Sequence, residues 1–331
     1  MPTNQRVESV YRGLISCHYI CVKIKYLFTD LSTMAGPFLK WAGGKRQLLD
    51  EIRKRIPADI SEIDTYIEPF VGGGSVLFWF LENFDLERVI ATDLNNELIQ
   101  CYVSIRDNHE SVAGKLISLV EEYPQNKDGQ REFFYRIREI WNSGVGEVGV
   151  IGEDALAERS AQTIFLNKTC FNGLFRVNKK GLFNVPCNYT KKPAFPSKSD
   201  LEVVSLSLQN VEFESCSYLN CEKYGGTGSF FYFDPPYRPL SKTSGFVSYS
   251  SEDFSDEDQK ELAELFRRLD SIGSKVLLSN SDPRNTNPED NFFDDIYDGY
   301  NIERINAKRS INSVGNRRGE ITEILVNNYR V

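Results

Sequence analysis

A run of four aromatic residues, 230–233, stops at Asp234-Pro235-Pro236-Tyr237. Aromatic residues favour β-strands, and the two prolines end the strand because they have no backbone N–H to donate. The pattern therefore predicts a strand that is followed at once by a carboxylate. Open α/β sheets bind their ligands at the carboxyl ends of the strands, so we expect Asp234 to lie at a binding site.

Short apolar runs alternate with helical patterns in the chain around this motif. Residues 76–81 predict a helix. Another helix is predicted to begin at Ser255, because Asp258 follows at capping-box spacing and apolar residues then recur on one face. Strands that alternate with helices indicate an α/β fold, with a mostly parallel sheet and helices on both faces. Besides 230–233, strands are predicted at residues 65–68, 88–92, 275–278 and 321–327.

The chain has 331 residues, which is typical of about two domains. Residues 97–196 interrupt the alternation, with helical periodicity up to Phe165 and then a stretch rich in Asn, Gly, Lys, Pro and aromatic residues. We interpret 97–196 as a mostly helical insertion with a hairpin or loop, which divides the main domain into parts 34–96 and 197–331. Residues 1–33 are predicted to be a dispensable extension ahead of a start at Met34. The alternative, an extra element docked on the core, stays open.

Basic residues are concentrated locally, although the net charge is −8. Residues 164–198 contain seven Lys or Arg and no acidic residue, and residues 304–318 contain five and none. A charged segment is usually a solvated face. Basic patches interleaved with Phe171, Phe175 and Phe183 are instead typical of surfaces that bind nucleic-acid phosphates.

The composition also excludes several classes of protein. No run of about 18 apolar residues occurs, which excludes a membrane-spanning helix. The seven cysteines are odd in number and form no Cys-x-x-Cys, so a disulfide framework is not predicted. Cys17, His18 and Cys21 lie close in sequence, but a structural zinc site needs four ligands and His109 is the only other histidine. We therefore predict reduced, mostly buried thiols and no metal.

A glycine loop follows the first predicted strand. Gly72-Gly73-Gly74 lies between strand 65–68 and helix 76–81, where the backbone can approach a ligand and a helix N-terminus points at it. Asp93 ends the next strand, at a position from which an acidic residue typically binds ribose hydroxyls. The spacing is not Gly-x-Gly-x-x-Gly, which disfavours an NAD-dependent dehydrogenase. A generic nucleotide site and a mere tight turn stay open.

Residues 234–237 together can grip a planar group that bears an amine. Asp234 and the carbonyl of Pro235 can accept its two protons while Tyr237 stacks on its face. The two prolines stiffen this turn and leave carbonyls with no adjacent N–H competitor. The alternative is a rigid surface turn.

These motifs resemble those of a known enzyme family. Asp-Pro-Pro-Tyr after a hydrophobic strand is typical of methyltransferases that act on amino groups in DNA. The ordered set of motifs, from about Phe38 to Tyr329, resembles the Dam-type (GATC-family) DNA adenine N6-methyltransferases. The matching segments are 38–46 (Phe-Leu-Lys-Trp-Ala-Gly-Gly-Lys-Arg), 68–74 (Glu-Pro-Phe-Val-Gly-Gly-Gly), 93–95, 171–176, 183–186, 310–313 and 323–326.

The resemblance implies a fold and a reaction. The fold is a Rossmann-like S-adenosylmethionine-dependent methyltransferase sheet, with 97–196 as an inserted target-recognition domain. The reaction transfers a methyl group from S-adenosyl-L-methionine to N6 of adenine in double-stranded DNA by base flipping, without a metal. GATC is the implied target, with a longer site such as GATATC as the alternative. The implied catalytic residues are Asp234, Pro235, Pro236 and Tyr237.

The family's other functional residues carry over position by position. Cys216-Ser217-Tyr218 stands where the family usually has Gly-Asp-Phe, so Ser217 is the weaker substitute for an acidic cofactor contact. Phe171 stands where relatives often carry Tyr, which keeps the stacking ring and loses a hydroxyl. The implied cofactor contacts are Trp41, Lys45, Phe70, Gly72, Asp93, Ser217 and Asp234. The implied DNA contacts are Phe171 and Asn172, in the space left by the flipped base, and Leu174 and Arg176, at base edges.

Other functions remain open. One is a related enzyme that acts on RNA or on cytosine N4, and another is a catalytically silent DNA-binding relative, against which the intact residues 234–237 argue. The resemblance further implies a prokaryotic cytoplasmic protein that works at the nucleoid with double-stranded DNA as its partner. Both a DNA-marking role and a restriction-modification role, with a separate cognate endonuclease, are compatible with it.

Overall fold

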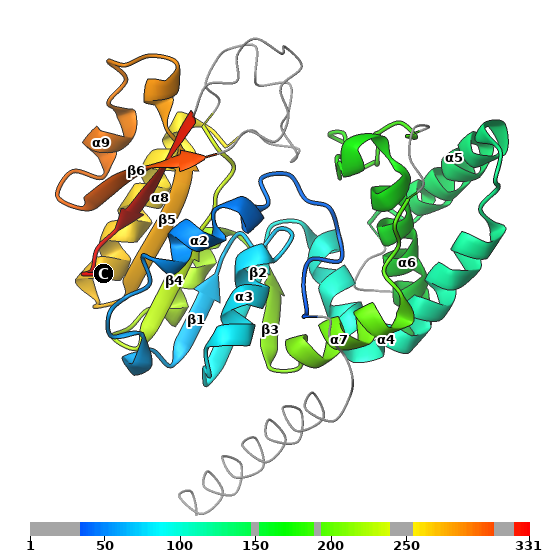
Figure 1. The fold of residues 1–331 in the computed structure, drawn as a ribbon, viewed down its shortest axis with the longest axis horizontal. Helices are drawn as coiled ribbons and strands as arrows, with labels where there is room; N and C mark the ends of the chain where they lie inside the picture. Colours follow the sequence, from blue (N-terminus) through cyan, green and yellow to red (C-terminus); the bar gives the residue numbers. More distant parts are fainter. Residues whose placement is uncertain (1–33, 147–151, 189–192, 239–253, 308–320) are drawn as a thin grey trace, which may run out of the picture.

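The computed structural model describes residues 34–146, 152–188, 193–238, 254–307 and 321–331. These residues build a seven-stranded sheet in the order β3-β2-β1-β4-β5-β7-β6 (Figure 1). The strands are β1 (Thr65–Glu68), β2 (Arg88–Asp93), β3 (Val211–Ser215), β4 (Ser229–Phe233), β5 (Lys275–Ser281), β6 (Asn301–Ala307) and β7 (Ile321–Asn327). The sequence predicted all of these except β3 and β6. Those two are the edge strands, where charged residues interrupt the apolar pattern.

The sheet is mostly parallel, as predicted. Strands β1 to β5 run in one direction, whereas β7 runs antiparallel to both β5 and β6. From β1 the chain moves outward through β2 to β3, and it then returns to the other side of β1 with β4. The order therefore reverses between β1 and β4, which is where open α/β sheets bind ligands.

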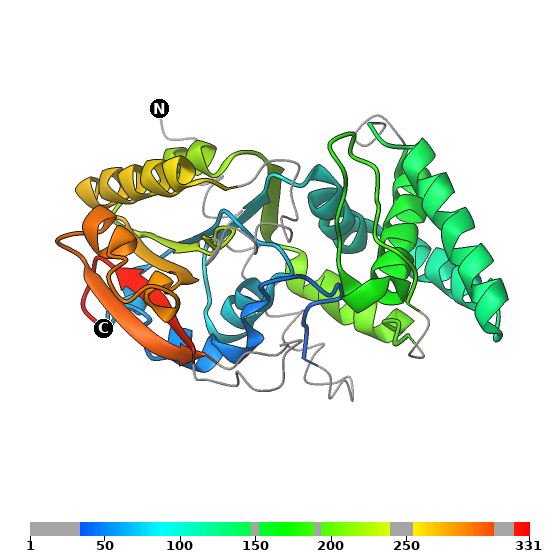
Figure 2. The same cartoon turned by 90° about the horizontal axis from the view of Figure 1, so that it is seen from above.

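Helices cover both faces of the sheet (Figures 1 and 2). Phe230 and Tyr232 of β4 pack into the core shared with α3 (Ser75–Asn83) and α4 (Asn96–Glu122). Phe231 and Phe233 point the opposite way, into the core shared with α8 (Asp256–Ser271). Because β4 is buried on both faces, its sequence is an unbroken aromatic run rather than an alternating one.

The chain leaves the sheet between β2 and β3. Helices α4, α5 (Lys127–Ser143) and α6 (Glu153–Thr169) form a group beside the sheet, α4 with a kink at Asn108, and α7 (Lys198–Leu208) leads back to β3 (Figure 2). After α6 come η3 (Phe171–Gly173) and a hairpin. The hairpin is held by backbone bonds such as Asn184 N to Arg176 O, at 3.1 Å. The helical periodicity and the hairpin predicted for this region are thus observed.

Short elements complete the fold, and α8 begins as the sequence predicted. Ser255 and Asp258 form a full capping box at the start of α8. The remaining elements are η1 (Lys45–Gln47), α2 (Leu49–Arg53), η2 (Ile60–Glu62), η4 (Tyr218–Tyr224), η6 (Pro283–Asn285) and α9 (Phe292–Ile296).

The described cysteines are unpaired. Cys101, Cys170, Cys187 and Cys221 are buried free thiols, and Cys216 is half-buried and also free. The described residues contain no cluster of His, Cys, Asp and Glu that could hold a metal ion. Within the same residues, no helix is both long and apolar enough to cross a membrane. Cys17, His18, Cys21, the extension 1–33 and the segment 310–313 lie outside the described residues.

Candidate active site

Several segments that are distant in sequence meet at one edge of the sheet. The glycine loop, Asp93 and Asp234 follow or end β1, β2 and β4, so they share the carboxyl edge of these parallel strands. The end of β5 lies at the same edge. Because β7 is antiparallel to β5, its first residues lie there too, with Glu323 opposite Ser281. This edge is therefore the candidate active site.

Asp234 lies at the centre of this edge, and its two carboxylate oxygens differ. The Lys45 ammonium lies 2.5 Å from Oδ1, and the Ser279 hydroxyl donates to the same Oδ1 at 3.1 Å. Among the described residues, no donor reaches Oδ2. The Asp234 side chain keeps 19% exposure, whereas Lys45 keeps 5%. Burial raises the pKa of Asp234, and the adjacent Lys45 charge opposes that rise.

The turn after Asp234 is fixed from behind by α8 and β5. Gln259 donates its side-chain amide to the Pro236 carbonyl at 3.1 Å, and Asn280 donates to Gln259 at 3.1 Å. Both Gln259 and Asn280 are fully buried. The Pro236 carbonyl is thus occupied by the protein itself, and the Pro235 carbonyl has no donor among the described residues. That carbonyl and Asp234 Oδ2 are thus two acceptors of the motif that no described donor occupies.

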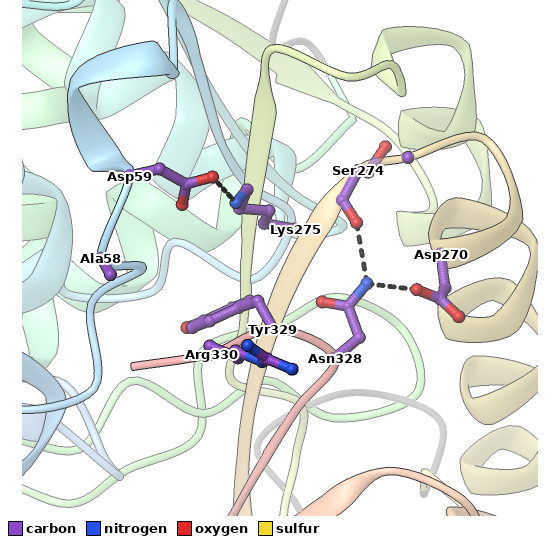
Figure 3. A pocket seen from close by; sticks show the side chains of 9 residues that line it. Ala58, Asp59, Asp270, Ser274, Lys275, Asn328, Tyr329 and Arg330 are labelled. Atoms are coloured by element: carbon purple, nitrogen blue, oxygen red, sulfur yellow. Dashed lines mark hydrogen bonds and ion pairs between the residues drawn. The ribbon is translucent and has the colours of Figure 1, made fainter.

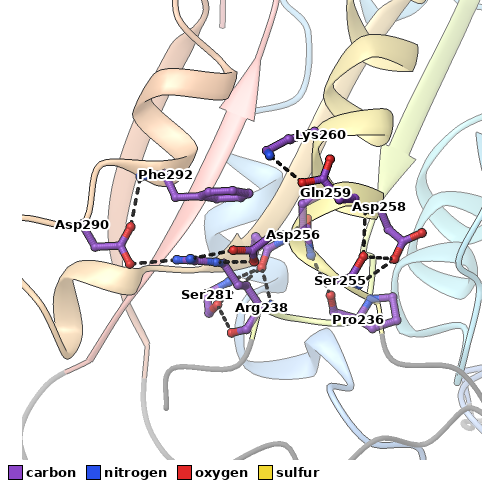
Figure 4. Close-up of polar contacts among 12 residues, drawn as sticks. Pro236, Arg238, Ser255, Asp256, Asp258, Gln259, Lys260, Ser281, Asp290 and Phe292 are labelled. Atoms are coloured by element: carbon purple, nitrogen blue, oxygen red, sulfur yellow. Dashed lines mark hydrogen bonds and ion pairs between the residues drawn. The ribbon is translucent and has the colours of Figure 1, made fainter. Parts of the chain in front are cut away.

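Arg238 ties the end of the same turn to two other elements (Figure 4). Its guanidinium makes two bonds to Asp256, at 2.7 and 2.9 Å, and one to Asp290 at 2.8 Å. The guanidinium also lies 4.2 Å from the ring centre of Phe292. The two carboxylates raise the pKa of Arg238, so it stays charged and holds the turn against the start of α8.

Tyr237 is held at its hydroxyl and at one face of its ring. The hydroxyl donates to Glu323 Oε2 on β7. The Lys45 ammonium lies 4.5 Å from the centre of the ring, close enough for a cation–π contact. Burial raises the pKa values of both Tyr237 and Glu323, so the phenol stays protonated and remains the donor of this bond.

The glycine loop lies against Trp41. Gly72 has a φ of +46°, and a Cβ on it would come within 2.9 Å of Trp41 Cδ1. A Cβ on Gly73 would come equally close to Trp41 Cβ. Only glycine therefore lets the loop approach the indole this closely. The other side of the loop is fixed by Tyr102, whose hydroxyl donates to Gly72 O at 3.0 Å.

Asp93 binds the backbone of the same loop. Its Oδ2 accepts from Gly72 N at 3.1 Å and its Oδ1 accepts from Asn95 N at 2.9 Å. Burial nevertheless raises the pKa of Asp93 to about 6, because two backbone bonds offset only part of the lost hydration. The carboxylate is oriented by these bonds, and each oxygen retains a further acceptor position.

A small aromatic cluster lies beside the loop at the end of β3. Phe70 stacks on Tyr218 with ring centres 5.3 Å apart, and Phe254 packs nearly perpendicular to Phe70 with ring centres 6.0 Å apart. Ser217 caps the start of η4 and accepts from Leu219 N at 3.4 Å. Aromatic rings at the edge of a sheet are groups on which a planar ligand can stack.

The helical group is attached to this site through Asn167, a fully buried residue of α6. Its amide accepts from Lys40 N at 2.8 Å and donates to Lys40 O at 2.9 Å and to Gly173 O at 3.0 Å. Trp41 also stacks on Phe175 of the hairpin, at 5.4 Å between ring centres. Residues 40 and 41 thus connect the glycine loop to the hairpin.

The predicted DNA-contacting residues lie on the hairpin side of this junction. Phe171 is 51% exposed, and Asn172 adopts a φ of +57°, the one positive φ of a non-glycine residue among the described residues. Leu174 is half-buried. Arg176 donates its Nε to Asn184 Oδ1 at 2.8 Å.

A cavity of about 460 Å³ lies at the opposite, amino end of β5 (Figure 3). Its polar groups largely bind one another. Lys275 pairs with Asp59, and Asn328 donates to Asp270 at 2.7 Å and to Ser274 O at 2.8 Å. None of the predicted site residues lines this cavity. It is therefore not the candidate active site.

The structure gathers the predicted catalytic and cofactor residues at one edge and shows several that sequence reasoning missed. Lys45, which was predicted as a cofactor contact, pairs with Asp234 and lies over the Tyr237 ring. Ser279, Gln259 and Asn167 received no role from the sequence because isolated buried polar residues have no distinctive pattern. Glu323 lay in a recognised segment but could not be connected to Tyr237 without the antiparallel register of β7.

Comparison with known proteins identifies the family. The model of the D12 class N6 adenine-specific DNA methyltransferases matches residues 41–311. The type II methyltransferase M.MjaIII of Methanocaldococcus jannaschii is 42% identical, over 88% of this chain and 99% of that protein. The type II methyltransferase M1.LlaDCHI of Lactococcus lactis subsp. cremoris is 37% identical, over 88% and 95%.

A third relative carries a different name. The DNA adenine methylase of Vibrio cholerae serotype O1 is 34% identical, over 87% of this chain and 94% of that protein. The matched range of the family model includes the glycine loop, the hairpin and the Asp-Pro-Pro-Tyr motif. The chain therefore belongs to the D12 class of N6 adenine-specific DNA methyltransferases.

Proposed function

We propose that this enzyme flips the adenine of a GATC site out of duplex DNA and methylates its N6 atom between Asp234 and Pro235. The observation that carries the proposal is the pair of open acceptors, Asp234 Oδ2 and the Pro235 carbonyl, beside an aromatic ring. An adenine inside a duplex cannot reach a buried carboxylate, so the base has to leave the stack.

The residues at the edge fit S-adenosylmethionine, the cofactor that membership of this family implies. The Gly72–Gly73 backbone and Trp41 form a close cradle, Asp93 offers oriented acceptors for ribose hydroxyls, and Phe70 with Tyr218 offers a stacking surface. Ser217 lies at the same strand end as a weaker polar contact. When bound, the cofactor supplies a methyl group on a positively charged sulfur.

The protein's part in the reaction follows from the geometry around Asp234. Lys45 and Ser279 hold Oδ1, so Oδ2 is turned to the incoming amine. Hydrogen bonds from N6 to Asp234 Oδ2 and to the Pro235 carbonyl favour a pyramidal nitrogen, whose lone pair is then free to attack. The raised pKa of Asp234 suits it to accept the proton that N6 must lose after methylation. Pro236 stiffens the turn, and Tyr237 stacks on the flipped base.

DNA contacts are assigned to the region 97–196, which we propose to be a target-recognition insertion. Exposed Phe171 and Asn172 enter the space left by the base, and Leu174 and Arg176 read base edges. Because Arg176 binds Asn184 only through Nε, its two terminal nitrogens can make a bidentate contact with guanine. Burial and nearby Lys40 lower the pKa of Lys168 to about 8, a cost that a DNA phosphate would offset.

The proposed activity is compatible with two cellular roles. One is DNA marking, and the other is protection of host sites from a separate restriction endonuclease. In either case double-stranded DNA is the partner, and the enzyme acts at the nucleoid in the cytoplasm.

The test is single-base sequencing of DNA methylated by the purified protein, with GATC and GATATC sites in the same substrate. N6-methyladenine at every GATC supports the proposal. Modification restricted to GATATC would show that the target is GATATC rather than GATC. Modification of cytosine N4 or preference for RNA in a competition would overturn it, as would DNA binding without any methyl transfer. Fluorescence of 2-aminopurine at the target base tests flipping separately, because the probe brightens when it is unstacked.

A matched pair of variants tests the hairpin assignment. Arg176→Ala should lose about 1–3 kcal/mol of discrimination between GATC and one-base-altered sites, with cofactor affinity unchanged. Lys179→Ala, at an exposed position in the hairpin turn, should weaken binding to all sequences alike. Equal behaviour of the two variants would assign Arg176 to a phosphate instead.

A further inference from the structure

Glu323 contacts the catalytic motif from a strand that carries none of the predicted catalytic residues. It lies near the start of β7, opposite Ser281 of β5 and Ile305 of β6. Its Oε2 accepts the hydrogen bond of the Tyr237 hydroxyl. Burial raises the pKa of Glu323, and the bond from Tyr237 opposes that rise. A half-buried carboxylate beside Asp234 is costly, because both groups are acidic and both lose hydration.

The contact has a geometric consequence for the Tyr237 ring. Pro236, which precedes it, is fixed by Gln259, so the remaining freedom lies in the side-chain torsions of Tyr237. The Lys45 ammonium occupies one face of the ring. The opposite face is the one left for a flipped base, and its direction is set by where the hydroxyl is anchored.

We propose that Glu323 is a positioning residue, which holds the Tyr237 ring at the angle required to stack on the target adenine. The proposal rests on the stacking role of Tyr237 in the proposed function. Glu323 itself touches neither the base nor the methyl donor, and it acts through the Tyr237 hydroxyl alone. Its effect should therefore disappear when that hydroxyl is absent.

A double-mutant cycle tests this dependence. The single-turnover methylation rate is measured with saturating DNA and cofactor for the unmodified protein, Glu323→Ala, Tyr237→Phe and the double variant. We expect each single variant to be slower by about 10²-fold, the order of loss that a small misplacement of reacting groups causes. The double variant should be no slower than either single variant, because both remove the same bond. Losses that multiply in the double variant would overturn the proposal.

Two further variants separate positioning from a merely structural role. Glu323→Gln keeps a side-chain oxygen that can accept from Tyr237, so it should retain a rate within about 5-fold of the unmodified protein. Glu303→Ala removes a glutamate from neighbouring β6 that pairs with Arg55 instead, and it should leave the methylation rate unchanged. A loss in Glu323→Gln as large as that in Glu323→Ala would show that the charge matters rather than the bond, and would overturn the proposal.

The same experiments distinguish this proposal from the proposed function. Tyr237→Ala removes the ring itself, and a normal rate in that variant would overturn the stacking role on which both depend. A large loss in Tyr237→Ala together with a normal rate in Glu323→Ala would overturn the positioning role alone. The emission of 2-aminopurine at the target base gives the spectroscopic signature: it should change in Glu323→Ala and Tyr237→Phe alike, with DNA affinity preserved.

Discussion

At the scale of single residues, the site is defined by how buried charges are paired. A buried carboxylate is unstable unless hydrogen bonds or an opposite charge replace its hydration. Asp234 receives both on Oδ1, from Lys45 and Ser279. Among the described residues, the one hydrogen-bond donor to the buried Glu68 is the Tyr66 hydroxyl, at 2.7 Å, and burial raises the pKa of Glu68 well above the ordinary range. Burial thus raises the pKa of both carboxyl groups, and Asp234 is the one of the two that is paired with a cation among the described residues.

Replacing Asp234 tests this assignment. Asp234→Ala should reduce methyl transfer by at least about 10²–10³-fold, because one of the two open acceptors for the adenine amine is lost. Duplex binding should fall little, since the basic hairpin is separate from residues 234–237. Single-turnover methylation and a DNA titration measure the two effects. Asp298→Ala, at an exposed position, is the control, and near-normal turnover in Asp234→Ala would show that the residue only shapes the turn.

The pKa of Asp93, about 6 in the folded protein, predicts a pH dependence of cofactor binding. The carboxylate must be ionised to accept two ribose hydroxyls, so affinity for S-adenosylhomocysteine should rise between pH 5 and pH 7. Stability of the free protein should depend on pH in the opposite direction from ligand affinity, because the pKa of Asp93 in the folded protein is raised above its usual 3.8. The contribution of Asp93 to this stability is fully present below pH 4 and is lost as the pH rises through about 6.

Calorimetric titration across this pH range measures the effect. Asp93→Asn should bind the same ligand about 10-fold more weakly at pH 7, which is the value of a lost hydrogen bond to a charged group. The pH dependence between 5 and 7 should also flatten in this variant. A steep dependence that persists in Asp93→Asn would assign it to another group.

At the scale of elements, two asparagine side chains bind the hairpin region to different neighbours. Asn167 of α6 forms hydrogen bonds with the backbone of Lys40 and of Gly173. It thereby connects the start of the hairpin region to residues 40 and 41, beside the glycine loop. Asn142 of α5 donates to Phe183 O at 3.2 Å and accepts from Phe183 N at 2.8 Å, so both partners lie between β2 and β3 in the chain. The bonds of Asn167 thus reach the N-terminal segment at Lys40, whereas those of Asn142 connect α5 to the hairpin only.

Alanine variants of these residues should therefore differ in function. Asn167→Ala should lower the free energy of unfolding by about 3 kcal/mol, because buried backbone groups lose their partners. It should also weaken cofactor binding, since Trp41 loses its fixed position against Gly72. Asn142→Ala should lower stability with cofactor affinity unchanged. Urea unfolding and ligand titration check both, and equal cofactor affinities in the two variants would contradict a link through Asn167.

At the scale of the whole molecule, acidic and basic regions are separated. The chain has a net charge of −8, yet the described residues 164–188, on the hairpin side, carry four basic residues and no acidic one. The acidic start of α8 is at the other side of the site, where Arg238 is bound by Asp256. We expect this distribution of charge to attract DNA to the hairpin side of the molecule.

Removal of residues 1–33 should leave this arrangement and the activity intact. The family model begins at residue 41, and the relative at 42% identity is matched over 99% of its length by 88% of this chain. A chain that begins at Met34 should therefore match the full chain in melting temperature and in methylation rate. A loss of either would show that the extension contributes to the folded enzyme.

The sequence alone determined the features that depend on local chemistry. The prolines after β4, the glycines after β1 and the capping box at Ser255 each restrict a few neighbouring residues, so their structural meaning is visible without the fold. The buried strand β4 was evident for the same reason, as its aromatic run is uninterrupted. The edge strands β3 and β6 were not, because one exposed side allows polar residues and weakens the pattern.

Only the tertiary structure decided which distant residues act together. Lys45, Asp234 and Glu323 come from η1, the end of β4 and the start of β7, and no spacing in the sequence relates them. Their contacts depend on the reversal of strand order between β1 and β4 and on the antiparallel register of β7. Register is set by packing over the whole sheet, whereas a sequence motif depends only on residues close to it in the chain. For that reason the sequence predicted a role for Asp234, and the fold was needed to show what holds this carboxylate and the tyrosine near it in place.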